Sequence, residues 1–448
     1  TLAARVSWQR SGEQYEIKLD NVSFANLDVA GSVSGTYLTV PEGRGVIDLS
    51  GAVSRANARS VGRYIPLRVG ERGRNWLEAA LLEGTASDIK VRLKGNLYDF
   101  PFPEGKGGMF QVTAHVTGGV LDYASGWPRI ENIDGDLTFR GSRMDIVARD
   151  ASIMAAKLAR VHAEIPDLGA ADRVLTVSGD AEGQTNEFLN FIAKSPVADL
   201  LDRFTDKIQA EGSGKLALKL TIPVSNIKDT RVEGAYQFIN NQLTVEGDLF
   251  PYEQVSGKLE FTESNVRVAN ATLNLLGGPA TLSGATQKDG TVRLNLAGHA
   301  NLDTIRRSNS AAWVQALHGA ADWRAAVTLR KRLADIVFDS SLQGVVSDLP
   351  APLAKTAADS LAFRLERRMT GKAQDRLVVS IGNIVSAQFQ RSNDGNQYII
   401  ERGNISLGGS AQEPERKGLW ISGSLKSFDL DQWLAVLKSA SSGTTYGE

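Results

Sequence analysis

The sequence predicts a mainly β protein: an elongated, twisted and curled antiparallel sheet that forms an open hydrophobic groove, with a few short amphipathic helices. Three observations predict this fold class. Apolar and polar residues alternate with a period of two in many segments. Turn residues, among them many of the 44 glycines, recur at short intervals. Long segments with the 3.6-residue periodicity of a helix are missing.

The alternation is clearest in residues 215–222, where every second residue is aliphatic. Successive side chains of a strand point to opposite faces of its sheet, so these aliphatic residues share one face. The same pattern occurs in residues 88–94, 175–178 and 291–296. One apolar and one polar face are typical of an antiparallel sheet with one side in water.

A recurring motif places a glycine on the apolar face of a strand. It occurs at Gly135, Gly234 and Gly257, each two residues from an apolar residue, with a looser copy in residues 421–425. Glycines inside strands usually mark bulges or close strand crossings. They also leave room for a ligand on the inner surface. Both interpretations stay open and are compatible, because a bulge also curves a sheet; the three glycines are candidates for shaping a groove.

Short amphipathic patterns predict a few helices that interrupt the strands. Pro196 follows Ser195, as expected for an N-cap and the first helical position. Such helices can cover or plug an edge of a sheet but are too short to form a helical domain. The predicted helical segments are 71–82, 186–193, 196–204, 302–317 and 429–437.

The number of strands favours one continuous sheet. About two dozen strands spaced about 4.8 Å apart extend about 115 Å in a single sheet. Separate sandwiches need linkers about every hundred residues, and no Pro/Ser-rich linker precedes the C-terminal end. We therefore expect a continuous β-groove segment over residues 1–438 and a flexible polar tail over residues 439–448. Because the chain begins at Thr1 without a signal peptide, we interpret it as a fragment.

The composition excludes several functional classes. The 50 basic residues nearly balance the 51 acidic residues, which argues against a nucleic-acid groove or a polybasic membrane-binding patch. The chain has no cysteine, so zinc ribbons, iron–sulfur sites, thiol nucleophiles and disulfides are excluded. A cysteine-free chain fits an oxidising compartment such as the bacterial periplasm.

Motifs for covalent chemistry are missing as well. No serine lies in a Gly-x-Ser-x-Gly motif, and none of the four Gly-Lys pairs is followed by Ser or Thr. The four histidines lack metal-binding spacing, and neighbouring aspartates such as Asp134 and Asp136 fit turns better than a glycosidase pair. We therefore expect no catalytic residue, no metal, no cofactor and no enzymatic activity.

Several short motifs follow one another in a specific order. The first are Tyr-Ile-Pro-Leu at 64–67, Trp-Leu-Glu-Ala-Ala-Leu at 76–81, Gly-Asn-Leu-Tyr-Asp-Phe-Pro-Phe at 95–102 and Leu-Asp-Tyr-Ala-Ser-Gly-Trp-Pro at 121–128. Later motifs include Leu-Gly-Gly-Pro at 276–279 and Leu-Pro-Ala-Pro-Leu-Ala-Lys at 349–355. From about residue 55 to 437 the chain resembles the YhdP branch of the AsmA-like proteins (AsmA, TamB and YhdP), the bridge-like lipid transport proteins of diderm bacteria.

The resemblance implies a location and a partner. AsmA-like proteins are anchored in the inner membrane by one N-terminal helix, cross the periplasm and form a repeating β-groove. Their apolar trough conducts phospholipids to the outer membrane and supports its permeability barrier. By this resemblance the chain is periplasmic, binds phospholipid, and belongs to a longer protein that reaches both membranes through segments missing here.

The residues themselves indicate the same mechanism. Acyl chains lie favourably on a face of Leu, Ile and Val, at about 0.8 kcal/mol per buried methylene, while the headgroup stays in water. An inward aliphatic residue is also commonly part of a packed core. The candidate lipid-groove residues are Ile89, Val91, Leu93, Leu175, Val177, Leu216, Leu218, Leu220, Ile222, Val292, Leu294 and Leu296.

Two alternatives from other classes stay open. The first is a periplasmic scaffold for outer-membrane protein assembly, whose sheet edges pair with other β proteins; a tightly filled interior would favour it. The second is a β-helix enzyme that acts on cell-wall polysaccharide. Regular coils with a carboxylate cluster would favour the enzyme, and the strand lengths are irregular.

Overall fold

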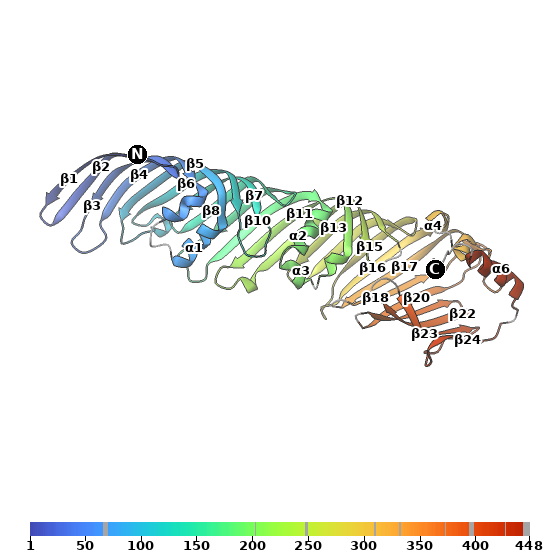
Figure 1. Ribbon diagram of the computed structural model, residues 1–448. Helices are drawn as coiled ribbons and strands as arrows, with labels where there is room; N and C mark the ends of the chain where they lie inside the picture. The colour runs from blue at the N-terminus through green and yellow to red at the C-terminus, as the bar shows by residue number, and fades with distance from the viewer. Residues whose placement is uncertain are drawn as a thin grey trace. The chain divides into compact units, whose positions relative to one another are not determined.

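The computed structural model of the chain describes residues 1–65, 70–201, 203–246, 250–308, 311–330, 333–371, 373–393, 398–425 and 427–441. Within them the chain forms 24 strands and six α-helices, so the predicted mainly β fold class is confirmed (Figure 1). All 24 strands belong to one sheet. No ladder between described residues joins β1 to β24, and the sheet is therefore open.

The strands are 3 to 16 residues long and follow one another with few interruptions. The first eleven are β1 (Leu2–Ser11), β2 (Gln14–Ala25), β3 (Val29–Leu38), β4 (Val46–Asn57), β5 (Leu81–Asn96), β6 (Gly108–Leu121), β7 (Ile130–Arg140), β8 (Arg143–Ile153), β9 (Ala156–Ile165), β10 (Val174–Gln184) and β11 (Ile208–Pro223). The others are β12 (Arg231–Val245), β13 (Tyr252–Thr262), β14 (Val266–Leu275), β15 (Gly278–Thr286), β16 (Val292–Asn301), β17 (Leu317–Arg330), β18 (Leu333–Ser340), β19 (Val345–Ser347), β20 (Phe363–Gly371), β21 (Gln374–Ile381), β22 (Val385–Asn393), β23 (Tyr398–Leu407) and β24 (Gly418–Gly423).

The chain divides into two compact units. The first unit comprises Thr1–Asp206, Ser213–Tyr236 and Phe261–Glu263. The second unit comprises Lys207–Gly212, Gln237–Glu260 and Ser264–Glu448. The boundary at residue 438 between a groove segment and a tail stays a prediction.

Within the first unit the strands form an antiparallel meander in which β1 to β10 each pair with the next strand. Alternating direction brings the ends of the even-numbered strands to one edge of the sheet, which we call the helical edge. The connection from β4 to β5 there contains η1 (Ala58–Arg63) and α1 (Glu71–Ala80), and that from β10 to β11 contains α2 (Thr185–Ala193), α3 (Val197–Leu200) and η3 (Phe204–Lys207). None of the connections between these strands at the opposite edge, the turn edge, is as long as those two.

The second unit continues the same pattern with one exception. Strands β14 to β18 and β20 to β23 form antiparallel ladders, and short β19 pairs with the start of β17. The exception is β24, which pairs with β23 in parallel, because the connecting residues 408–417 return along the sheet before β24 begins. At the helical edge of this unit lie α4 (Leu302–Ser308) and α5 (Ala312–Gln315), and α6 (Leu430–Ser441) follows β24.

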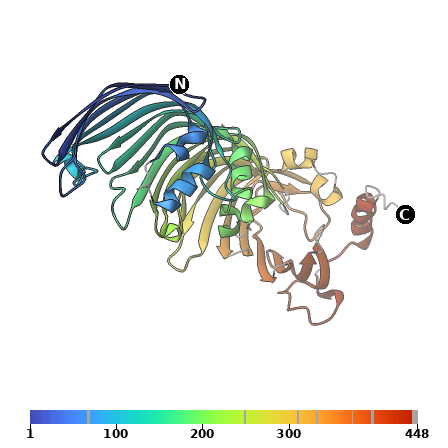
Figure 2. The same ribbon diagram turned by 60° about the vertical axis from the view of Figure 1, so that its left-hand side comes forward.

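The predicted helical segments agree with these elements within a few residues, except that 302–317 contains two short helices. Helix α6 includes the first three residues of the predicted tail, and residues 442–448 lie outside the described part of the chain. In Figure 2 the strands of the first unit bend in one direction, and α1 and α2 lie within their curve.

Candidate functional site

One face of the sheet in the first unit is lined by apolar residues that stand directly opposite one another on successive strands. We call it the apolar face and the other side the polar face. Each pair in this row is a register pair of a ladder, so the residues are lateral neighbours about 5 Å apart. Across β6 to β11 the row consists of Ala114, Leu137, Ile146, Ala163, Val177 and Leu220.

A second row runs beside the first toward the turn edge. Across β5 to β9 it consists of Val91, Val112, Phe139, Met144 and Ile165. The predicted residues of β5 therefore share a face with those of β10 and β11. On the last two strands Leu175 lies opposite Ile222, and Val177 lies opposite Leu220.

The second unit has an equivalent apolar face, which includes the predicted residues of β16. Leu294 lies opposite Val327, and Val292 lies opposite Leu329. One wholly apolar row of this face crosses β15 to β18 and β20 to β23. It consists of Leu282, Leu296, Ala325, Phe338, Leu365, Val379, Ala387 and Ile405.

The apolar residues are only partly covered. Of the twelve predicted groove residues, Leu296 alone is enclosed, with 8% of its surface exposed; the other eleven are half-buried. The accessible surface of the chain is 27417 Å², compared with about 16,500 Å² for a compact monomer of this mass. The apolar face is therefore only partly covered by the chain's own side chains, apart from local clusters.

One such cluster lies in the second unit, where Trp323 is 3% exposed and packs with Val255, Leu273 and Leu296. The Trp323 ring stacks on Phe338 at a centroid distance of 5.5 Å. Trp323 also lies opposite Gly298, whose missing side chain leaves space for the indole. Large aromatic residues thus fill part of the apolar face near the helical edge.

Helix α2 covers the apolar face of the first unit at the helical edge. The Tyr236 hydroxyl donates a hydrogen bond to Thr185 Oγ1 at 2.8 Å, and the Phe188 ring packs edge-on against Tyr236 at 5.1 Å. Burial raises the pKa of Tyr236 above its usual value. The helix therefore narrows this side of the face, whereas the turn edge has no comparable helix among the described residues.

The three candidate groove-shaping glycines lie where neighbouring atoms come close. A Cβ atom on Gly135 would lie 2.6 Å from the Val147 carbonyl oxygen, and one on Gly234 would clash with the Phe261 ring. Gly257 has a positive φ of 151°, and a Cβ there would lie 2.6 Å from that of Ala271. These contacts support the interpretation as positions of close approach; their role in shaping a groove stays a prediction.

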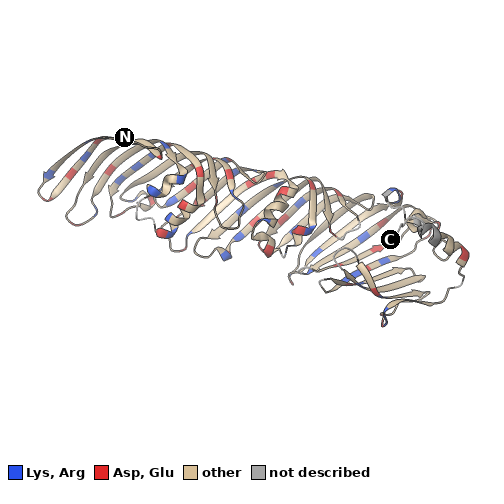
Figure 3. Ribbon diagram, viewed as in Figure 1, with Lys and Arg blue, Asp and Glu red and all other residues tan. Residues whose placement is uncertain are grey.

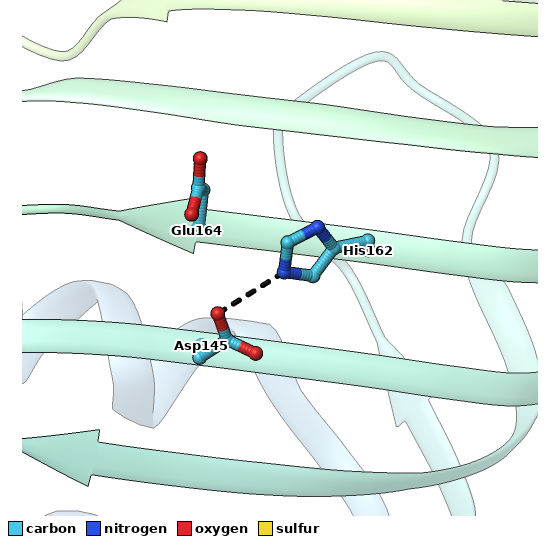
Figure 4. A group of neighbouring side chains, drawn as sticks. All are labelled: Asp145, His162 and Glu164. Carbon is cyan, nitrogen blue, oxygen red and sulfur yellow. Dashed lines mark hydrogen bonds and ion pairs between the residues drawn. The ribbon is translucent and has the colours of Figure 1, made fainter.

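Charged residues are spread along the strands (Figure 3), and on the polar face many of them pair across strands. Each of the four histidines contacts an aspartate, at distances from 2.8 to 3.1 Å. In one such group His162 Nε2 lies 3.1 Å from Asp145 Oδ2, and Asp145 lies opposite Glu164 in the ladder (Figure 4). The hydrogen bond with His162, followed by that with Arg143, lowers the pKa of Asp145.

The ligand atoms of Asp145, His162 and Glu164 lie within 4.8 Å of one another, close enough to hold a metal ion. The Arg143 guanidinium already donates to both carboxylates, at 3.3 Å to Asp145 and 2.5 Å to Glu164. A metal ion would have to displace this cation. The group is thus accounted for as cross-strand charge pairing on the polar face.

Sequence reasoning missed the residues that join the predicted segments, such as Phe139, Met144 and Ile146. Their alternation is present but short, because residues with positive φ interrupt the strands, among them Asn132 in β7 and Arg160 in β9. If the period-two pattern is continued through these interruptions, it predicts Phe139, Met144 and Ile146 as further residues of the apolar face.

A family model described as YhdP protein matches residues 1–447 of the chain. The chain belongs to the YhdP family. The intermembrane phospholipid transporter YhdP of Escherichia coli (strain K12) is 22% identical over 375 residues, which make up 81% of this chain. They make up 29% of that protein, so the chain spans less than a third of its relative's length. No solved structure matches the chain.

The YhdP assignment confirms the family resemblance that the ordered motifs indicate. Among the described helices of this YhdP-family chain, none has the length and apolar character needed to cross a membrane.

Proposed function

We propose that the chain is a segment of a phospholipid conduit, in which acyl chains lie on the apolar face of a β-groove. The observation that carries this proposal is the apolar row that crosses successive strands of each unit, most of whose residues are only partly buried. The name of the E. coli relative, an intermembrane phospholipid transporter, supports phospholipid as the ligand. The three groove-shaping glycines would help the sheet to curve around it.

The mechanism follows from burial of methylenes. Each acyl methylene that leaves water gains about 0.8 kcal/mol, and the polar headgroup stays hydrated at the opening. Successive strands offer similar Leu, Ile and Val contacts, so a lipid can move across them without a deep energy minimum. No covalent step is required, and we infer that the chain is not an enzyme and uses no cofactor.

The location is part of the same proposal. We place the chain in the periplasm, where the longer protein would carry phospholipid between the inner and outer membranes and support the outer-membrane permeability barrier. Anchorage in the inner membrane, which the family resemblance implies, stays a prediction for the longer protein. The relative's printed name and the family match support the intermembrane role.

The alternative function, a scaffold for outer-membrane protein assembly, predicts a different interior for the sheet. Edge pairing with other β proteins needs no accessible apolar face, and a closely packed interior would be expected. Partly buried rather than enclosed aliphatic residues such as Leu218 and Leu294 favour the conduit instead.

Site-specific photocrosslinking in cells tests the proposal. A photoreactive residue at Leu294 lies on the apolar face, and the matched control at Arg293 lies next to it on the exposed polar face. We expect phospholipid to be captured at Leu294 and not at Arg293. Failure to capture lipid at Leu294, Leu218 and Val91 alike would contradict the conduit and favour the scaffold.

A further inference from the structure

The apolar faces of the two units differ in charge. Neither of the two rows of the first unit contains a charged residue. In the second unit Arg367 lies within an otherwise apolar row, opposite Ile336 on β18 and Leu377 on β21. Asp375 and Arg391 lie on the same face, two residues further toward the turn edge, where they form a register pair.

Asp375 and Arg391 neutralise each other. The Arg391 guanidinium donates two hydrogen bonds to the carboxylate, at 2.9 and 2.7 Å, and the Asp375 side chain is fully enclosed. The guanidinium also lies over the Tyr398 ring, 4.4 Å from its centroid. This buried pair is complete and leaves no charge to be matched by a ligand.

Arg367 has no such partner among the described residues. Its Nε atom is enclosed without a hydrogen-bond acceptor, and no ion pair or hydrogen bond of this side chain occurs within the described residues. Its neighbours Arg364 and Arg368 both pair with Glu366, which points to the polar face. A partly buried guanidinium without a counter-charge is unfavourable, so this position favours an anionic ligand.

The residues around Arg367 indicate which class of anion this side chain would bind. Phe363 lies four residues away on the same face, a distance of about 13 Å along the strand. Its ring contacts Phe338, which stacks on Trp323. A cation on one side and aromatic and aliphatic residues on the other match an amphiphile with an anionic head. A free phosphate ion would lose hydration here and gain nothing from the apolar surface.

We propose that Arg367 binds the phosphate of a phospholipid whose acyl chains lie on the apolar face of the second unit. A guanidinium binds phosphate oxygens through two parallel hydrogen bonds, which fixes orientation as well as charge. The headgroup then lies toward the turn edge and the acyl chains toward the helical edge. This inference rests on the proposed function and adds to it a headgroup contact.

Binding measurements on the purified chain test the inference. The probes are phosphatidylglycerol and a diacylglycerol with the same acyl chains and no phosphate. We expect Arg367→Gln to weaken phosphatidylglycerol binding about tenfold, equivalent to about 1.4 kcal/mol, and to leave diacylglycerol binding unchanged. The matched control Arg368→Gln, on the polar face, should change neither, and Arg367→Lys should recover part of the lost affinity.

The other outcomes separate the two proposals. If wild type binds both lipids and Arg367→Gln alters neither, the headgroup contact is wrong and the conduit stands. Equal losses for both lipids, or displacement of phosphatidylglycerol by excess inorganic phosphate, would likewise overturn a phospholipid-specific contact. If wild type binds neither lipid, both proposals fail. Circular dichroism of each variant establishes that the sheet is intact.

Discussion

Replacing Leu220 with aspartate should strongly reduce the phospholipid held on the apolar face of the first unit. Leu220 lies opposite Val177, and Leu218 and Ile222 flank it on the same face of β11. A carboxylate at this position takes apolar contact away from an acyl chain. It also has to lose hydration whenever a chain covers it, which is unfavourable for an unpaired charge.

The magnitude follows from the contacts. If the acyl chain loses contact equivalent to about two methylenes, at about 0.8 kcal/mol each, binding weakens by about 1.6 kcal/mol or about 15-fold. The protein loses less folding stability than it would at a fully enclosed position, because Leu220 is only partly buried. Removing its buried part lowers the free energy of unfolding by about 1–1.5 kcal/mol. Lipid occupancy should therefore fall while the sheet persists.

The assay is quantification of co-purified phospholipid per mole of protein by mass spectrometry. The matched control is Lys219→Asp, which places the same carboxylate one residue away on the exposed polar face. The control should keep wild-type occupancy. Wild-type lipid content in a folded Leu220→Asp variant would refute the reasoning, as would an equal loss in Lys219→Asp.

Three further predictions concern stability, each measured by urea unfolding. Trp323→Ala should lower the free energy of unfolding of the second unit by about 3–5 kcal/mol because the ring is enclosed, whereas Trp8→Ala, at a residue 72% exposed, should cost far less. Asp375→Asn leaves the Arg391 cation without its counter-charge and should cost about 3–5 kcal/mol; a loss under about 1 kcal/mol would contradict an enclosed pair. Burial, followed by a neighbouring aspartate, raises the pKa of Tyr123 to about 12, so the wild type should lose stability as pH rises from about 10 through 12. Tyr123→Phe should lose less over that range, and equal losses would contradict the shift.

The faces of individual strands could be predicted from sequence, but their partners could not. A period of two places Leu216, Leu218, Leu220 and Ile222 on one side of a strand wherever that strand pairs. Pairing of Leu220 with Val177 depends on the connection between β10 and β11, which holds two α-helices and a 3-10 helix. Alternation carries no information on register across such a connection.

Residues that break the alternation are harder to interpret from the sequence than residues that follow it. Arg367 interrupts an apolar pattern in residues 363–369, and a single charge in such a pattern looks like a strand irregularity until its neighbours are known. The surroundings of Gly234 depend on Phe261, 27 residues further along the chain, so its close contact could not be read from the local motif. Both features arise from contacts between strands rather than within one.

The meander has a consequence for how the protein unfolds. Within each unit a strand contacts little besides the strands before and after it, so stability is approximately a sum of hairpin terms and neighbour terms. A chain of this kind need not unfold in one cooperative step, and segments can open locally while others keep their ladders. Thermal unfolding should be broad. A damaging substitution in one hairpin should then remove hydrogen-exchange protection near that hairpin first, with distant strands still protected.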